Sequence, residues 1–108
     1  MTIQYSWDYS PDSDILNVHA KGKKVKGSAE LGEFTFDFDS DENIIGLEIT
    51  NIAEIFNELI NKEQLSEISG AKIALVTRGN ATYALLYLKL PKREQIIEIT
   101  APPLIAAR

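Results

Sequence analysis

The residues of this chain whose types and spacing come closest to a known chemistry are acidic. Oxygen donors of the kind that suits hard cations follow the ligand spacing of a calcium-binding loop, and they are Asp37, Asp39, Asp41, Asn43 and Glu48. Two features oppose this assignment. The sharp turn of such a loop requires glycine where this chain has Glu42, and the flanks should be helical, whereas here apolar and polar residues alternate. We therefore favour a polar hairpin turn, and we keep as the alternative a weak divalent-metal (Ca²⁺ or Mg²⁺) binder or a metal-assisted hydrolase that uses Asp37, Asp39, Asp41 and Glu48.

The remaining titratable residues do not form a recognisable catalytic set. Asp8, Asp12 and Asp14 lie around Pro11, and short acidic side chains beside proline commonly bond the backbone of a turn. If Asp14 is buried, it should accept backbone amides and have a structural role. His19 is the only histidine, the chain has no cysteine, and no acid or serine adjoins His19 in the sequence. We predict that His19 lies at the surface, and the sequence predicts no catalytic residue and no cofactor.

Length and composition predict a single globular domain over residues 1–108. The chain is 44% hydrophobic and 25% charged, and its size allows a core without a disulfide or a structural metal. The formal net charge of -5 and the pI of about 4.8 disfavour nucleic acid and acidic membranes as partners. Residues 1–10 alternate apolar and polar residues instead of having the pattern of a signal peptide, and no apolar run is long enough to cross a membrane, so we expect neither export nor membrane insertion. Together with the absence of cysteine, this favours a cytoplasmic location.

The elements that would position these residues can be read from periodicity. In the first half, apolar and polar residues alternate in four segments, which predicts strands over residues 3–9, 14–20, 34–39 and 45–49. Turn residues join them into two hairpins, and the lysine-rich residues 21–27 predict an exposed loop. Apolar residues then recur at intervals of three and four over residues 52–60, which predicts an amphipathic helix. Asn51 and Glu54 have the spacing of a capping box at its start.

The carboxyl half predicts three further strands within residues 71–100. They cover residues 72–77, 82–90 and 95–100, after a separate helical turn over residues 65–69. The whole chain is therefore expected to be an α+β domain. It would have an antiparallel, hairpin-built sheet of about seven strands and one main amphipathic helix after the fourth strand.

Two stretches of the first half resemble a known family. They are Tyr-Ser-Pro-Asp-Ser-Asp-Ile-Leu-Asn-Val at residues 9–18, and Phe-Asp-Phe-Asp at residues 36–39 with the run from Asn43 through Gly-Leu-Glu-Ile to Glu54. This pattern is similar to the uncharacterised domain-of-unknown-function family 2283, and it covers residues 5–54. The chain departs from the pattern at Glu42-Asn43, where the family usually has glycine. The resemblance implies a small β-rich domain without an assigned activity, and it transfers no catalytic residue.

The segment over residues 82–90 bears most directly on function because both of its faces are largely apolar. A strand of this kind must be covered on two sides, and a single helix is too narrow to cover a seven-stranded sheet. Either a second sheet layer within the chain or a twofold partner must cover the rest. We favour the partner, and predict a homodimer whose interface includes Tyr83, Leu85, Tyr87, Leu104 and Ile105.

The predicted function is accordingly that of an uncharacterised small domain which acts as a non-catalytic, homodimeric protein-interaction module. An unidentified protein partner is a further possibility for the same surface. The alternatives are the metal binder or hydrolase described above and a small-ligand binder with a pocket between helix and sheet, for which nothing in the residues selects a ligand.

Overall fold

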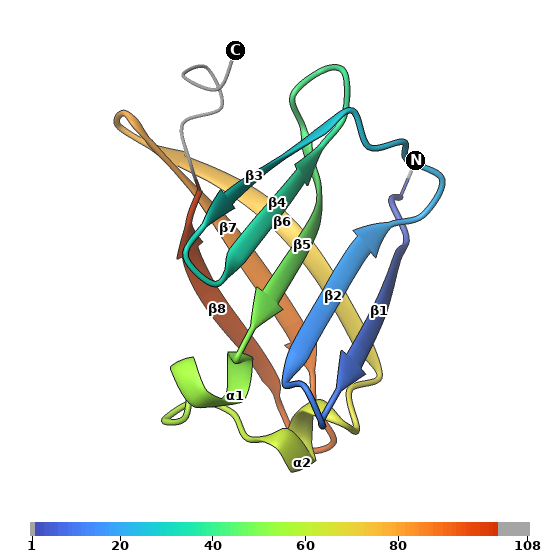
Figure 1. Ribbon diagram of the computed structural model, residues 1–108, viewed down its shortest axis with the longest axis vertical. Helices are drawn as coiled ribbons and strands as arrows, with labels where there is room; N and C mark the ends of the chain where they lie inside the picture. Colours follow the sequence, from blue (N-terminus) through green and yellow to red (C-terminus); the bar gives the residue numbers. More distant parts are fainter. Residues whose placement is uncertain (1, 102–108) are drawn as a thin grey trace.

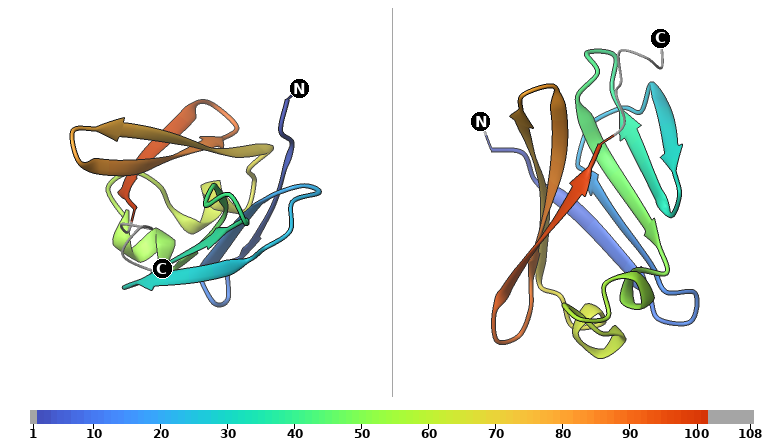
Figure 2. Two further views of the ribbon diagram at one scale, coloured as in Figure 1. Left: turned by 90° about the horizontal axis from the view of Figure 1, so that it is seen from above. Right: turned by 90° about the vertical axis from the view of Figure 1, so that its left-hand side faces the viewer.

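Two antiparallel β-sheets pack face to face in the computed structural model, which describes residues 2–101 (Figure 1). The first sheet contains, in spatial order, β1 (Tyr5–Ser10), β2 (Ile15–Ala20), β5 (Ile44–Thr50), β4 (Phe34–Phe38) and β3 (Gly27–Leu31). The second sheet contains β6 (Gly70–Arg78), β7 (Ala81–Lys89) and β8 (Glu94–Thr100). Two short helices, α1 (Ile52–Ile55) and α2 (Lys62–Leu65), lie at one end of the two layers (Figures 1 and 2).

The expectation of one sheet of about seven strands is wrong in both number and layering. The seven predicted strands all appear, but the described chain has eight strands divided between the two sheets. Alternation shows that one face of a strand is buried, and it does so equally whether a helix or a second sheet buries that face. The periodicity could therefore identify the strands but not the way in which they divide into layers.

The eighth strand, β3, falls partly in and directly after the segment predicted as a loop. Its sequence is Gly-Ser-Ala-Glu-Leu, which has no alternation of bulky apolar residues. It is an edge strand that pairs with β4 from Gly27 opposite Phe38 to Leu31 opposite Phe34. A Cβ at Gly27 would lie 3.0 Å from Cζ of Phe38, so glycine lets this ring lie against the strand. Pairing with β4, rather than its own β-propensity, explains why this segment is a strand.

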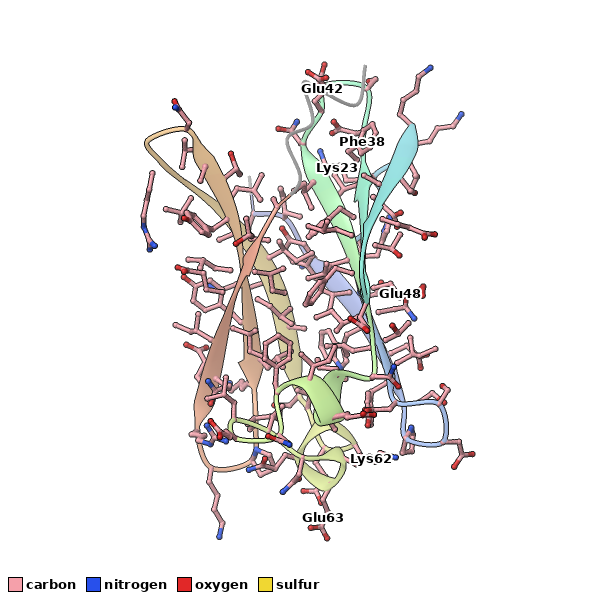
Figure 3. All side chains as sticks on the ribbon, turned by 60° about the vertical axis from the view of Figure 1, so that its left-hand side comes forward. Lys23, Phe38, Glu42, Glu48, Lys62 and Glu63 are labelled. Atoms are coloured by element: carbon pink, nitrogen blue, oxygen red, sulfur yellow. The ribbon has the colours of Figure 1, made fainter. Side chains whose placement is uncertain are left out.

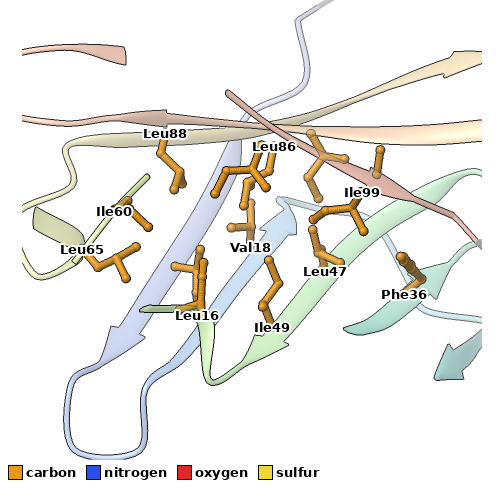
Figure 4. Packing of buried hydrophobic residues seen from close by; sticks show 14 of the residues in the cluster. Leu16, Val18, Phe36, Leu47, Ile49, Ile60, Leu65, Leu86, Leu88 and Ile99 are labelled. Carbon is orange, nitrogen blue, oxygen red and sulfur yellow. The ribbon is translucent and has the colours of Figure 1, made fainter. Parts of the chain in front are cut away.

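The core lies between the sheets and is filled from both inner faces (Figures 3 and 4). The strands β2 and β7 bury every second residue, as alternation predicts, and burial of each large aliphatic side chain contributes about 1.5–3 kcal/mol. The fully buried side chains include Leu16, Val18, Phe36, Ile49, Leu86, Leu88 and Ile97, joined by Ile60 and Leu65 from the connection between the sheets.

The single main amphipathic helix is also wrong, because residues 52–60 do not form one continuous helix. The helix α1 has four residues and ends at Phe56, whose φ of -108° and ψ of 38° are not helical. The apolar residues Ile52 and Ile60 do reach the core, as the stripe predicts, but Ile55 and Leu59 are exposed. The apolar spacing therefore reflects a connection between the two sheets in which only some apolar side chains, among them Ile52 and Ile60, reach the core.

The predicted capping box at Asn51 is wrong, and an equivalent box occurs ten residues later. Asn51 has a left-handed backbone (φ 56°, ψ 37°) and its side chain makes no capping hydrogen bond. At α2, the Asn61 side chain accepts from the Gln64 amide at 2.8 Å, and the Asn61 amide donates to Oε1 of Gln64 at 3.1 Å.

Neither of the two helices found within residues 2–101 has the length and apolar character that a membrane span requires.

Candidate interaction surface

The strand β7 has two apolar faces, and the structure covers one of them within the chain. Ala84, Leu86 and Leu88 point into the core and are fully buried. The residues between them belong to the opposite, outer face of the three-stranded sheet and are half-buried, namely Tyr83, Leu85 and Tyr87. The second sheet layer, one of the two solutions expected from the sequence, thus accounts for the inner face only.

Neighbouring strands extend this outer row into a patch. The strand register places Val76 of β6 opposite Tyr83, Ala74 of β6 opposite Leu85, and Ile96 of β8 opposite Tyr87. Ile96 is 47% exposed, which is high for an isoleucine at the middle of a strand. We refer to these six side chains as the apolar patch, and they are Ala74, Val76, Tyr83, Leu85, Tyr87 and Ile96.

The two edges of the three-stranded sheet carry opposite charges beside the apolar patch. On β6 the outward charged residues are Lys72 and Arg78, which we call the basic edge, and on β8 they are Glu94 and Glu98, which we call the acidic edge. Nζ of Lys72 lies 4.9 Å from the centroid of the Tyr87 ring. Cation–π contacts at exposed sites contribute about 0.5–1 kcal/mol. The basic edge therefore borders the aromatic rings of the patch directly.

Among residues 2–101, Arg78 alone joins the two edges within one copy. Its guanidinium carbon lies 5.2 Å from the centroid of the Tyr83 ring, and its Nη1 lies 3.0 Å from Oε1 of Glu98. Both partners of this ion pair are well exposed, so the pair contributes about 0–1 kcal/mol to stability. No described residue forms an ion pair or hydrogen bond with the side chain of Lys72 or Glu94, although Lys72 does lie over Tyr87.

Leu104 and Ile105, the other two predicted interface residues, lie outside the described residues. Their part in the interface stays a prediction.

Asp14 has the structural role that the sequence predicted for it if buried. The side chain is 5% exposed, and its carboxylate accepts from the Ala53 amide at 3.1 Å and from the Glu54 amide at 3.3 Å. These donors are the first-turn amides of α1 rather than amides of its own turn. Asp14 thereby does for α1 what Asn51 was expected to do, since a carboxylate near helical amides satisfies groups that have no partner within the helix.

The Asp14 carboxylate is also held by Tyr9. The Tyr9 hydroxyl donates to Oδ1 of Asp14 at 2.7 Å. Burial of the phenol, together with the hydrogen bond to Asp14 and its charge, raises the pKa of Tyr9 above its usual value. This arrangement ties the β1–β2 turn to the start of α1, and it has the features of a structural link.

The carboxylates of the predicted metal loop lie in a strand–turn–strand segment. Asp39 accepts from the amides of Asp41 at 2.9 Å and of Asn43 at 3.0 Å, and the backbone hydrogen bond from Asn43 lowers the pKa of Asp39. Asp37 accepts from the Ser28 hydroxyl at 2.5 Å, and Glu48 points away from the core on the outer side of the five-stranded sheet (Figure 3). Within residues 2–101, no three His, Cys, Asp or Glu side chains are grouped closely enough to hold a metal ion. The described geometry is that of the polar hairpin, and it does not support the metal-binding or hydrolase alternative.

The sequence analysis missed the close approach of two side chains, His19 and Asp37, to Gly46 on the outer face of the five-stranded sheet. Both residues are opposite Gly46 in the register, one from β2 and one from β4. A Cβ at Gly46 would lie 2.8 Å from Cδ2 of His19 and 3.0 Å from Oδ2 of Asp37, so only glycine leaves room for the two side chains. An isolated glycine inside a strand was the signal that could have indicated this close approach to the Gly46 backbone. The Ser28 hydroxyl donates to Asp37 and not to the His19 imidazole. These three residues therefore do not have the arrangement of a catalytic triad, in which the nucleophile bonds the base and the acid orients the base.

A hollow between α2 and the turn after β7 corresponds to the predicted pocket between helix and sheet. Its volume is about 340 Å³, and polar and charged side chains of α2 form much of its lining, with residues 90–93 on the other side. In the described part of the chain no buried side-chain nitrogen or oxygen lacks a hydrogen-bond partner. Nothing in the hollow selects a ligand.

Comparison with known proteins agrees with an uncharacterised small domain. Residues 7–52 match the model of a family described as a protein of unknown function, DUF2283. The chain is similar to the uncharacterized protein MJ0789 of Methanocaldococcus jannaschii, with 28% identity over 100 residues that cover 91% of this chain and 83% of that protein. No solved structure matches the chain. The family match confirms the resemblance found in the first half, and it spans the five-stranded sheet from within β1 to the start of α1.

Proposed function

We propose that this chain is a non-catalytic protein-interaction module that forms a homodimer through the outer face of its three-stranded sheet. The observation that carries the proposal is the apolar patch, which lies at the centre of that face and over which no described helix or strand packs. At one end Ile3 and Trp7 border it, in a hollow of about 410 Å³ that Tyr87 also lines. The single domain over residues 1–108 and the cytoplasmic location stay predictions.

The composition of the patch supports protein binding more than solvent exposure. An antiparallel sheet that faces water on one side normally shows polar residues there. Here the central strand presents Tyr83, Leu85 and Tyr87 instead. Tyrosine is enriched at the energetic centres of interfaces, and an apolar centre with a charged rim is the usual anatomy of such surfaces.

The size of the patch predicts a weak association. Three strands about 4.8 Å apart, each used over about six residues, give a face roughly 14 Å wide and 20 Å long. Such an area lies at or below the lower end of stable interfaces. We therefore expect a dimer that dissociates at micromolar concentrations and has to be measured over a wide range.

The test is the mass of the protein in solution as a function of concentration. Sedimentation equilibrium from about 1 µM to about 1 mM should show a transition from the 12.0 kDa chain to twice that mass. Leu85→Lys places a charge at the centre of the patch and should raise the dissociation constant at least about 100-fold. Asn17→Lys is the matched control, because Asn17 is an exposed strand residue on the outer face of the five-stranded sheet and the added charge is the same.

Two results would overturn the proposal. One is a wild-type mass of 12.0 kDa at every concentration. The other is a dimer that Asn17→Lys weakens as much as Leu85→Lys does.

A further inference from the structure

We propose that the two copies are related by a twofold axis that runs along β7, so that the basic edge of each copy lies against the acidic edge of the other. This inference rests on the proposed function, and it specifies how the second copy is placed. It is carried by the distribution of charge across the three-stranded sheet.

Each edge strand presents a single sign of charge on the outer face. The outward charged residues of β6 are Lys72 and Arg78, and those of β8 are Glu94 and Glu98. The apolar patch separates the two edges over most of their length, and the exposed Lys89 of β7 lies beside Glu94 at one end of the sheet. A surface with this asymmetry is complementary to itself only when β6 of the second copy lies over β8 of the first, and β8 of the second copy lies over β6 of the first.

For two sheets packed face to face, the twofold axis lies in the plane between them and has two simple orientations. An axis along the strands exchanges β6 with β8 and leaves β7 against β7. An axis across the strands leaves β6 against β6 and β8 against β8. Aligned sheets keep their strand directions within about 30°, so the first axis would lie within about 15° of β7.

The register shows which charges would meet in each case. Lys72, Tyr87 and Ile96 form one row across the sheet. With the axis along β7, Lys72 faces Ile96 of the second copy. Glu94 and Glu98 of that copy then lie two residues away along the strand, roughly 7 Å to either side. A lysine side chain spans this distance, so each Lys72 gains an acidic partner.

The other orientation brings carboxylates together at the middle of the patch, whereas the axis along β7 brings Lys89 against Lys89 only at the end of the face, where each lysine lies beside Glu94. Ala74, Leu85 and Glu98 form the row at the middle of the patch. An axis across the strands through this row places Glu98 opposite Glu98 of the second copy, and Lys72 opposite the apolar Val76. Covering a lysine without a partner and pairing two carboxylates both oppose association. The net charge of -5 on each copy makes such local pairing more important.

Single cysteines can distinguish the two orientations because the chain has none of its own. Ala74→Cys and Glu98→Cys lie in the middle row on β6 and β8. With the axis along β7, residue 74 of one copy faces residue 98 of the other. Oxidation of an equal mixture of the two variants, one of them labelled with ¹⁵N, should therefore give the mixed disulfide dimer as the main cross-linked product. Each variant oxidised alone should remain largely uncross-linked, as should the control Asn17→Cys on the five-stranded sheet.

Each other outcome overturns the inference in a different way. Efficient self-cross-linking of each variant alone would show the axis across the strands, and it would leave the proposed dimer through this face intact. Absence of cross-linking in proteins that sediment at twice the chain mass would show that the dimer uses another surface. A monomeric mass for the wild type and both variants would remove the proposed function, and this inference with it.

Discussion

The outer faces of the two sheets differ, although both sheets fill the same core with their inner faces. Across the five-stranded sheet, one register row is polar from edge to edge and consists of Asp8, Asn17, Glu48, Thr35 and Glu30. Across the three-stranded sheet, a comparable row consists of Val76, Tyr83 and Thr100, and its neighbour of Ala74, Leu85 and Glu98. Apolar residues thus occupy the middle of one outer face only.

This difference supports the proposal that a partner binds the outer face of the three-stranded sheet rather than that of the five-stranded sheet. The polar face is adequately solvated and requires no cover, as is usual for one side of an antiparallel sheet. The apolar face exposes hydrophobic area that a second copy could remove from water, at about 25 cal/mol per Å². The family match falls on the sheet with the polar outer face, and the apolar patch lies outside the matched residues.

The largest effect that we expect is on the stability of the fold, and it comes from a residue outside the proposed dimer interface. Asp14→Ala leaves the Ala53 and Glu54 amides and the Tyr9 hydroxyl without their buried acceptor. We expect the free energy of unfolding to fall by about 3 kcal/mol, measured by urea denaturation at a concentration where the protein is monomeric.

The control for this variant is Asp12→Ala, which removes an exposed carboxylate from the same turn and should change the free energy of unfolding by less than about 0.5 kcal/mol. If Asp14→Ala and Asp12→Ala were equally stable, Asp14 would not be the link between the turn and α1.

A smaller effect is expected at the edge of the apolar patch. Lys72→Glu makes both edges of the three-stranded sheet acidic, so it should weaken the dimer about tenfold through repulsion from Glu94 and Glu98 of the second copy. Sedimentation of the variant measures the dissociation constant. Adding Glu94→Lys and Glu98→Lys to Lys72→Glu should restore most of the affinity.

The matched control is Lys24→Glu, which makes the same charge change in the exposed loop before β3 and should leave the dissociation constant within about twofold of the wild type. Equal weakening by Lys24→Glu and Lys72→Glu would point to net charge rather than to the pairing of edges.

The smallest effect is an alkaline loss of stability at the Tyr9–Asp14 link. Because folding raises the pKa of Tyr9 through burial and the neighbouring Asp14, the neutral phenol stabilises the fold fully below its ordinary pKa of 10.0. That contribution declines as the pH rises above this value, since the unfolded chain then releases the proton more readily. In urea denaturation across this range, Tyr9→Phe should lose stability less steeply than the wild type. Identical slopes would contradict the account.

Much of the fold could be predicted because alternation is a local property. Phe36, Leu47 and Leu86 were placed on buried strand faces from spacing alone, and they are buried. The division into two sheets depends on contacts between distant segments, which the same spacing does not specify. The helix was overestimated because Ile52, Phe56 and Ile60 reach the core from two turns that begin and end separately.

The candidate site was predictable in part for similar reasons. Tyr83, Leu85 and Tyr87 were found because a strand with two apolar faces is visible in the sequence. Their neighbours Ala74 and Ile96, and the opposite charges of the two edges, depend on the register of β6 and β8, which only the structure provides. The cap on α1 was missed because Asp14 acts on an amide 39 residues away.

The difference between the two outer faces is tested most directly by dilution of a ¹⁵N-labelled sample. Amide spectra recorded from about 1 mM to about 10 µM report which residues change surroundings when the dimer dissociates. The account predicts concentration-dependent shifts for Ala74, Leu85 and Ile96 and their row neighbours, and constant positions for Asn17 and Glu48. Shifts centred on Asn17 and Glu48, or a spectrum that does not change anywhere, would contradict it.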